Sequence, residues 1–405
     1  MQVTLKNKIT LYFRRTLLSI LSGLLAGTAA AAFLISLEWA TQTRNENSWI
    51  IWLLPLGGFF IGWVYHHYGH DVSEGHNLIL NEIHDPQNIV PLKMTPLILL
   101  STILTHLFGG SAGREGTAVQ MGASLSDQLG HFFKIEAAER KILLIAGTGA
   151  GFGAAIGTPW AGFIFGMEVI SVGRLKLFAW FECFVASFIA YFTAVFLQAP
   201  HSHFPTIDKI DFNFKTLAYV LVAGVLFGFT AKIFIFTTHS FEKMWAKLIS
   251  YPPLKPFFAG MILILLYYIE GSYRFVGLGI PWIQEALTSP GSFADPVLKS
   301  LFTALTVGSG FKGGEFIPLV FIGTTLGNAL AIILPVSFKL LAAVGFAAVF
   351  AGAANTPIAC SVMAIELFGW SIAPYAVVGC FVSYYFSGHD GIYRGQRRKT
   401  KLWSR

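Results

Sequence analysis

Two glutamates lie inside glycine-rich segments of a chain that is otherwise apolar. Glu115 belongs to the run GGSAGREGT at residues 109–117, and Glu315 belongs to GSGFKGGEFIP at residues 308–318. A carboxylate is costly inside a membrane and is a functional residue there by default. Because protonation removes its charge, each glutamate is a candidate to carry a proton.

Three glycine-rich segments, at residues 74–79, 109–117 and 308–318, lead into predicted helices. Unpaired backbone N–H groups and the helix dipole make a helix N-terminus positive. Several such ends that meet at one point can bind an anion without a full positive charge. A permeating anion must also be held weakly enough to leave. The alternative interpretation is that the glycines only allow helices to pack closely.

Glu115 can compete with an anion for such a site. When ionised it would occupy the anion position, and when protonated it would be free to swing away. The alternative interpretation is an ion pair with Arg114, although adjacent residues in a helix do not face each other. We expect Glu315 to be a second proton site, unless Lys312 neutralises it.

The composition excludes most other classes of protein. Hydrophobic residues make up 54 % of the 405 residues and charged residues only 12 %, whereas an average soluble protein is about a quarter charged. The three cysteines show no disulfide or metal-binding pattern. We therefore predict an all-α integral membrane protein, one transport domain over residues 1–405, with no soluble regulatory domain, cofactor or metal.

The apolar stretches differ in length. A spanning helix needs about 20 residues, and three stretches are too long for one crossing and contain Gly and Pro. We expect a polytopic bundle of tilted, broken and re-entrant helices, since broken backbone survives in a bilayer only where it is buried or lines a cavity. The stretches are 16–37, 49–68, 91–108, 142–172, 174–198, 214–236, 254–270, 299–335, 338–368 and 371–388.

Basic residues gather at the two ends of the chain, which carries a net charge of +7. Lys and Arg flank membrane spans on the cytoplasmic side. This placement favours a lipid bilayer rather than nucleic acid as the partner. It predicts a multi-pass protein of the inner membrane with both termini in the cytoplasm. The residues are Lys6, Lys8, Arg14, Arg15, Arg394, Arg397, Arg398, Lys399, Lys401 and Arg405.

The two halves of the chain repeat each other. Residues 154–168 match residues 352–366 at an offset of 198, which pairs Glu168 with Glu366. Upstream, we pair Gly113 with Gly313 and Glu115 with Glu315, at an offset of 200. Repeated halves are typical of transporters, whose sites lie at the repeat interface. We place the halves at about 14–200 and 214–388, and expect Glu168 and Glu366 to cap helix ends.

These motifs resemble the CLC family of chloride channels and proton-coupled anion antiporters. The family pattern G-[KR]-E-G-P is present as Gly113-Arg114-Glu115-Gly116-Thr117, and G-x-F-x-P as Gly314-Glu315-Phe316-Ile317-Pro318. The family's G-S-G-I-P is represented by Gly75-His76-Asn77-Leu78-Ile79. The pore tyrosine of the family is best matched by Tyr393.

The departures from the pattern resemble the bacterial CLC-type fluoride/proton antiporters. They are His76, Asn77, Thr117 and Glu315, together with Val169 where chloride/proton exchangers carry an inner glutamate. The resemblance implies two inverted repeats, a homodimer with one pore per subunit, and proton-coupled fluoride export gated by Glu115. It implies an anion site made by Gly75, His76, Asn77, Gly113, Arg114, Gly116, Thr117, Gly314, Phe316, Ile317 and Tyr393. The alternative is a chloride channel or chloride/proton exchanger of the same family.

Fluoride chemistry fits these residues. Fluoride is strongly hydrated, so replacing its water requires firm hydrogen-bond donors, which His76, Asn77 and Tyr393 can supply. Alternatively, His76 is a packing residue and Tyr393 an interfacial anchor. An intramembrane metalloenzyme would need more than the histidines at residues 66–70, because no H-E-x-x-H pattern accompanies them. We therefore predict that the protein is not an enzyme.

Overall fold

The computed structural model describes residues 5–207, 210–388 and 390–397, with side chains from residue 12 onward. The basic residues Arg398, Lys399, Lys401 and Arg405 lie outside this part. Within it the chain forms α-helices and short 3-10 helices, with no strand. The helices are α1 (Leu5–Glu46), α2 (Leu54–Tyr68), α3 (His76–His84), α4 (Met94–Leu107), α5 (Glu115–Phe132), α6 (Ala137–Ile156), α7 (Pro159–Glu168), α8 (Trp180–Phe196), α9 (Phe214–Leu248), α10 (Leu254–Glu270), α11 (Ile280–Ala286), α12 (Ala294–Gly308), α13 (Phe316–Leu330), α14 (Phe338–Ala354), α15 (Pro357–Phe368) and α16 (Ala373–Phe386).

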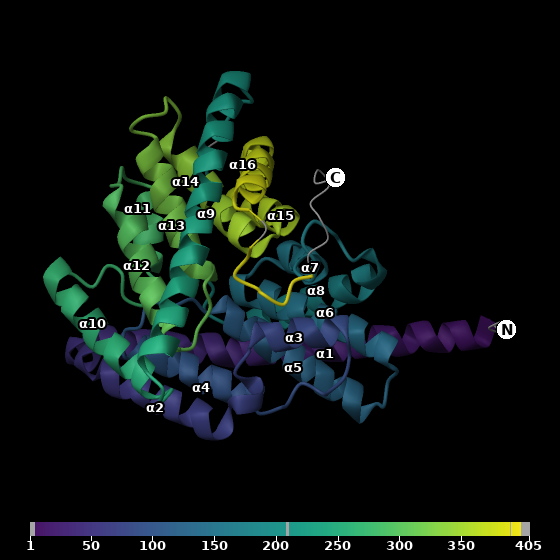
Figure 1. Ribbon diagram of the computed structural model, residues 1–405. Helices are drawn as coiled ribbons and strands as arrows, with labels where there is room; N and C mark the ends of the chain where they lie inside the picture. Colours follow the sequence, from purple (N-terminus) through teal and green to yellow (C-terminus); the bar gives the residue numbers. More distant parts are fainter. Residues whose placement is uncertain (1–4, 208–209, 389, 398–405) are drawn as a thin grey trace.

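Four helical segments are long and apolar enough to cross a membrane, and several others are shorter. The four are Tyr12–Glu46, Ser48–Tyr68, Leu177–Phe196 and Phe214–Leu248. Large apolar side chains on the outside of the bundle, such as Phe196 at 84 % exposure, are stable when they face lipid rather than water. In Figure 1, α9 and α11–α16 lie above α1–α5.

The long apolar stretches are broken where the sequence predicted. Gly157 ends α6 in the left-handed region at φ +88°, and Pro159 begins α7. Asn355 ends α14 at φ +57°, and Pro357 begins α15. A left-handed residue closes a helix, and proline fits the first position of the next. The stretches 142–172 and 338–368 therefore each form two short helices.

Close glycine contacts show how the halves correspond. A Cβ on Gly122 would lie 2.5 Å from the carbonyl oxygen of Gly147, where α5 crosses α6. A Cβ on Gly323 would lie 2.0 Å from the carbonyl oxygen of Gly345, where α13 crosses α14. These crossings match Gly122 with Gly323 at an offset of 201. The offset of 200 predicted from the sequence is therefore wrong by one residue for this part of the repeat.

Each half caps a helix of the other. Glu168 at the end of α7 accepts hydrogen bonds from the backbone N–H of Ile358 (3.0 Å) and Ala359 (2.7 Å) at the start of α15. Glu366 in α15 accepts from Trp160 (3.2 Å) and Ala161 (3.1 Å) at the start of α7. Carboxylates are stabilising at helix N-termini, whose N–H groups lack partners. The prediction that both glutamates cap helix ends is confirmed.

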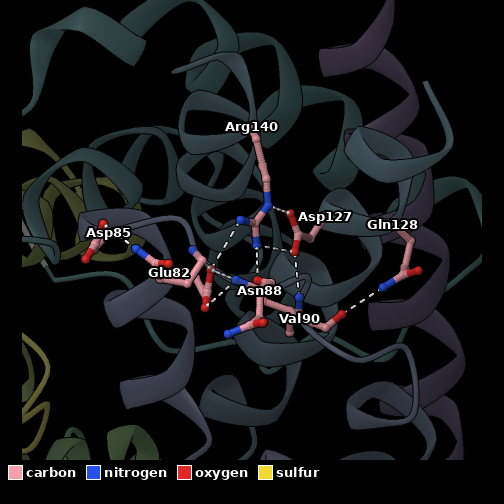
Figure 2. A network of polar contacts seen from close by, with 8 residues as sticks. Glu82, Asp85, Asn88, Val90, Asp127, Gln128 and Arg140 are labelled. Atoms are coloured by element: carbon pink, nitrogen blue, oxygen red, sulfur yellow. Dashed lines mark hydrogen bonds and ion pairs between the residues drawn. The ribbon is translucent and has the colours of Figure 1, made fainter. Parts of the chain in front are cut away.

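A buried polar network fixes the segment between α3 and α4 (Figure 2). Arg140 pairs with Asp127 (2.6 Å) and Glu82 (3.2 Å), and its Nη2 also donates to the carbonyl oxygen of Asn88. The carboxylates of Glu82 and Asp127 in turn accept backbone N–H groups, including those of Asn88 and Val90. Since Glu82 belongs to α3, this network holds α3 against α5 and α6.

Candidate functional site

The helices α5 and α13 begin at the same point. Gly113 N–H donates to the Gly314 carbonyl (2.5 Å), and Gly314 N–H donates to the Gly113 carbonyl (2.7 Å). A Cβ on Gly314 would lie 2.8 Å from the backbone nitrogen of Gly116, so only glycine allows this approach. The pairing corrects the predicted match of Gly113 with Gly313: Gly113 is equivalent to Gly314, and Glu115 is therefore equivalent to Phe316 rather than to Glu315.

The helix α3 brings the third N-terminus to this point. Gly75 precedes α3 at φ +56°, a conformation that favours glycine, and His76 is the first helical residue. A Cβ on Gly116 would lie 3.0 Å from Cε1 of His76. The imidazole of His76 therefore lies against the start of α5, and the three glycine-rich segments meet as the sequence predicted.

A cavity of about 400 Å³, which we call the Tyr393 cavity, opens beside this meeting point. The ring of Tyr393, 9 % exposed, lies 5.0 Å from the ring of His76, centroid to centroid. The Oδ1 atom of Asn77 accepts the backbone N–H of Gly395 (2.9 Å), which ties α3 to the segment that carries Tyr393. The residues that line the cavity include Gly75, His76, Asn77, Gln120, Glu242, Lys312, Glu315, Tyr393 and Arg394.

Glu115 is the first residue of α5, next to the meeting point, and is 1 % exposed. Its carboxylate accepts the backbone N–H and the Nε–H of Arg114, both at 3.3 Å. The two neighbours can pair because Arg114 precedes the helix, at φ −120°. The ion pair that the sequence offered as an alternative is thus present. Arg114 also donates to the hydroxyl of Ser202 (3.1 Å).

Arg114 lines a second cavity, of about 580 Å³, which we call the Arg114 cavity; its lining also includes residues near the end of α1, among them Arg44. The Tyr393 cavity is lined by Tyr65, near the end of α2, and by residues 72–77 after it. In the described part of the chain, the two cavities share no lining residue. Glu115 is flanked by Arg114, which lines one cavity, and by Gly116, which lies against His76 of the other.

Glu315 lies directly before α13 and lines the Tyr393 cavity. The Nζ of Lys312 lies 4.0 Å from the centroid of the Tyr65 ring, a cation–π contact. The contact of the Lys312 ammonium group is thus with the Tyr65 ring rather than with the Glu315 carboxylate. At the same cavity, Arg394 pairs with Glu242 of α9 and donates from Nε to Nε2 of His239 (3.3 Å).

Three predicted site residues turn their side chains away from an anion. The hydroxyl of Thr117 is hydrogen-bonded to that of Thr102 (2.8 Å). Phe316 and Ile317 are 2 % and 3 % exposed, and the Phe316 ring packs edge-on against Phe350. Phe316 and Ile317 can therefore offer an anion only their backbone N–H groups, and the backbone N–H of Thr117 already donates to the carbonyl oxygen of Arg114 (3.1 Å).

Two glutamines at the site were missed by the sequence prediction. Gln120 of α5 lies 3.2 Å from Nδ1 of His76. Gln396 donates to the carbonyl oxygens of Val169 and Ala354, both at 2.8 Å, and so fixes the segment after Tyr393 to both halves. In the sequence, Gln120 is a polar residue five positions after Glu115 in the same helix. Its partner His76 lies 44 residues away, so the sequence did not indicate their contact.

A model of the family described as voltage gated chloride channel matches residues 57–388. The chain belongs to this family. It is also 47 % identical over 383 residues to the "Chloride/fluoride channel protein" of Pseudomonas syringae pv. tomato, covering 93 % of this chain and 85 % of that protein. The family resemblance predicted from the motifs is confirmed.

Solved structures support the same fold for this voltage gated chloride channel homologue. The crystal structure of a CLC-type fluoride/proton antiporter superposes with a TM-score of 0.93, at 31 % identity, covering 98 % of this chain and all of that chain. A slow cyanobacterial Cl−/H+ antiporter superposes with a TM-score of 0.81, at 22 % identity, over 92 % of this chain and 94 % of its own. The predicted all-α, polytopic membrane fold is confirmed.

Proposed function

We propose that the protein is a proton-coupled fluoride exporter, a fluoride/proton antiporter of the CLC type. The observation that carries the proposal is the buried Glu115 at the junction of three helix N-termini, with neighbours that line two separate cavities. The similarity to a CLC-type fluoride/proton antiporter supports it. An anion and a proton can use one carboxylate in turn, because ionised Glu115 excludes the anion and protonated Glu115 does not.

Fluoride would enter through the Tyr393 cavity and rest among the backbone N–H groups at the starts of α3, α5 and α13. Side-chain donors there would come from His76, Asn77 and Tyr393. The backbone segments can approach each other closely because they carry glycine at positions 113, 116 and 314. Glu115 would take a proton from the Arg114 cavity, admit fluoride to its own position, and release the proton toward the Tyr393 cavity. Fluoride would leave past Arg114.

Glu315 is the candidate for a second proton site. It lines the Tyr393 cavity, on the side where Glu115 would release its proton. Val169 occupies the position of the inner glutamate of chloride/proton exchangers, so another carboxylate is required on this side. Glu242 at the same cavity is engaged by Arg394.

The wider setting follows from the same proposal. We place the Tyr393 cavity on the cytoplasmic face of the inner membrane. Arg14 and Arg15 lie at the N-terminal end of the first span, and the second span would return to that side near Tyr65, which lines this cavity. Both termini would then be cytoplasmic. We expect a homodimer with one pore per subunit, fluoride and protons as the transported species, and no enzymatic activity.

Glu115→Gln tests the coupling. Gln is isosteric and cannot release a proton, so we expect fluoride movement without proton uptake in proteoliposomes that report both ions. Glu242→Gln is a control, because it changes a carboxylate of the Tyr393 cavity that lies outside the proposed relay. Proton uptake at the wild-type ratio in Glu115→Gln would contradict the proposal.

A chloride channel or chloride/proton exchanger is the second candidate, favoured by the name of the Pseudomonas relative, which includes chloride. His76 and Asn77 distinguish the two candidates. If their donors select fluoride, the double variant His76→Ser, Asn77→Gly should carry more chloride relative to fluoride, by about tenfold for one lost charge-assisted hydrogen bond. Unchanged selectivity would favour the second candidate.

A further inference from the structure

The environment of His76 fixes which ring nitrogen carries its proton. A neutral imidazole has one donor nitrogen and one acceptor nitrogen. The Nε2 amide of Gln120, which can only donate, lies 3.2 Å from Nδ1 of His76. With the amide in this orientation, Nδ1 is the acceptor and the proton resides on Nε2.

The amide of Gln120 is confined on its other side by backbone. A Cβ on Gly75 would lie 3.1 Å from Oε1 and 3.3 Å from Nε2 of Gln120. Gln120 is itself only 7 % exposed. The amide plane therefore sits between the start of α3 and the body of α5, which limits the orientations it can adopt.

The Nε2–H group of His76 is buried and has no partner among the described residues. An unsatisfied buried donor is costly unless an acceptor arrives. Cε1, the ring carbon bonded to Nε2, lies against Gly116 at the start of α5. The free donor is thus placed at the junction of helix N-termini, where an anion is expected.

We propose that Gln120 is a positioning residue that holds His76 in the Nε2–H tautomer, so that a neutral histidine presents a hydrogen-bond donor to fluoride. The inference rests on the proposed function. With the opposite tautomer, Nε2 would present a lone pair to the anion and repel it. Fluoride, a compact and strongly accepting anion, is more sensitive to such a donor than chloride. Gln120 would therefore act on selectivity without touching the anion.

Nitrogen-15 NMR of the full-length, histidine-labelled protein in lipid nanodiscs tests the assignment directly. The shifts of Nδ1 and Nε2 distinguish the two tautomers, and His76→Asn identifies the His76 signals by their loss. We expect the Nε2–H form in the wild type, and a displaced Nε2 signal on addition of sodium fluoride but not of sodium chloride at equal concentration. The Nδ1–H form in the wild type would overturn the inference without any variant.

Gln120→Leu keeps the side-chain size and removes the donor. We expect a mixture of tautomers at His76 and a fluoride dissociation constant raised by about tenfold. Gln128→Leu is the matched control, since Gln128 lies on the same helix and donates to the carbonyl oxygen of Val90 (2.7 Å), in the network of Figure 2. It should leave the His76 tautomer unchanged.

The outcomes separate the two proposals. An unchanged His76 tautomer in Gln120→Leu overturns the role of Gln120, whatever the transport rate. Wild-type protein that moves no fluoride overturns the proposed function and, with it, the role of His76 as a fluoride donor. A changed tautomer together with weakened fluoride binding and unchanged chloride flux supports the inference.

Discussion

Asn77 links the proposed anion site to the segment that carries Tyr393. Its Oδ1 accepts the N–H of Gly395, and a Cβ on Gly395 would lie 3.2 Å from the Asn77 carbonyl oxygen, so the two segments are in close contact. Asn77 therefore helps to hold Tyr393 in place, in addition to offering its own amide to the anion. This second role was not predicted, because the two partners lie 318 residues apart.

Asn77→Leu should release this segment. The loss of one neutral hydrogen bond costs about 1 kcal/mol, so amide hydrogen exchange in residues 391–397 should become about fivefold faster. Exchange within α16, which Asn77 does not contact in the hydrogen-bond network described above, serves as the internal control. Unchanged exchange at residues 391–397 would show that the other hydrogen bonds of the segment, such as those of Gln396 and Ile392, hold it without Asn77.

At the level of single residues, the sequence predicted which residues form the site better than it predicted their hydrogen-bond partners. Glu115, His76 and Tyr393 were predicted from motif types, and the structure brings their segments together. The contact between Gln120 and His76 was not predicted, because a hydrogen bond between two helices leaves no periodic pattern in the chain. The Arg114–Glu115 pair was underestimated because helix geometry was applied to a residue that precedes the helix.

At the level of helices, the exchanged caps join the two halves. Glu168 supplies acceptors to α15 and Glu366 supplies them to α7. Because the contacts are reciprocal, substitutions at the two positions should have equivalent effects. The prediction of caps was possible because both glutamates follow a Thr-Pro pair at the same distance; that each caps the other half required the structure.

Glu168→Ala and Glu366→Ala should each lower stability by about 2 kcal/mol, the value of hydrogen bonds to a charged acceptor. The Gln variants keep one acceptor oxygen and should lose less. Thermal unfolding in detergent tests the expected order of stability at each position, in which the wild type is most stable, the Gln variant intermediate and the Ala variant least stable. Glu242→Ala is the control, because its ion pair with Arg394 is about half exposed and such pairs contribute little. An alanine variant as stable as the wild type would contradict the capping role.

At the level of the whole molecule, the predicted broken spans and repeated halves are present. The predicted offset of 198 agrees with the structure, whereas the offset of 200 predicted upstream is wrong by one residue. The offset is 201 at Gly122 and Gly323 but 198 at Gly147 and Gly345. The two crossing glycines are 25 positions apart in the first half (Gly122, Gly147) and 22 in the second (Gly323, Gly345), which accounts for the change. Matching by glycine-rich composition alone allowed a slip of one residue upstream. The crossing glycines fix the register because no other residue fits there.

We infer alternate access rather than an open pore from the buried Glu115, whose neighbours line two separate cavities. A channel conducts anions down their own gradient, whereas an exchanger converts a proton gradient into anion movement. The central claim is therefore tested by proteoliposomes with equal fluoride inside and outside, the membrane potential clamped at zero, and a pH gradient as the only driving force. We predict that fluoride moves out of the more alkaline compartment toward the acidic one, in exchange for protons. Fluoride that stays at equal concentration under this gradient would contradict the proposed antiport.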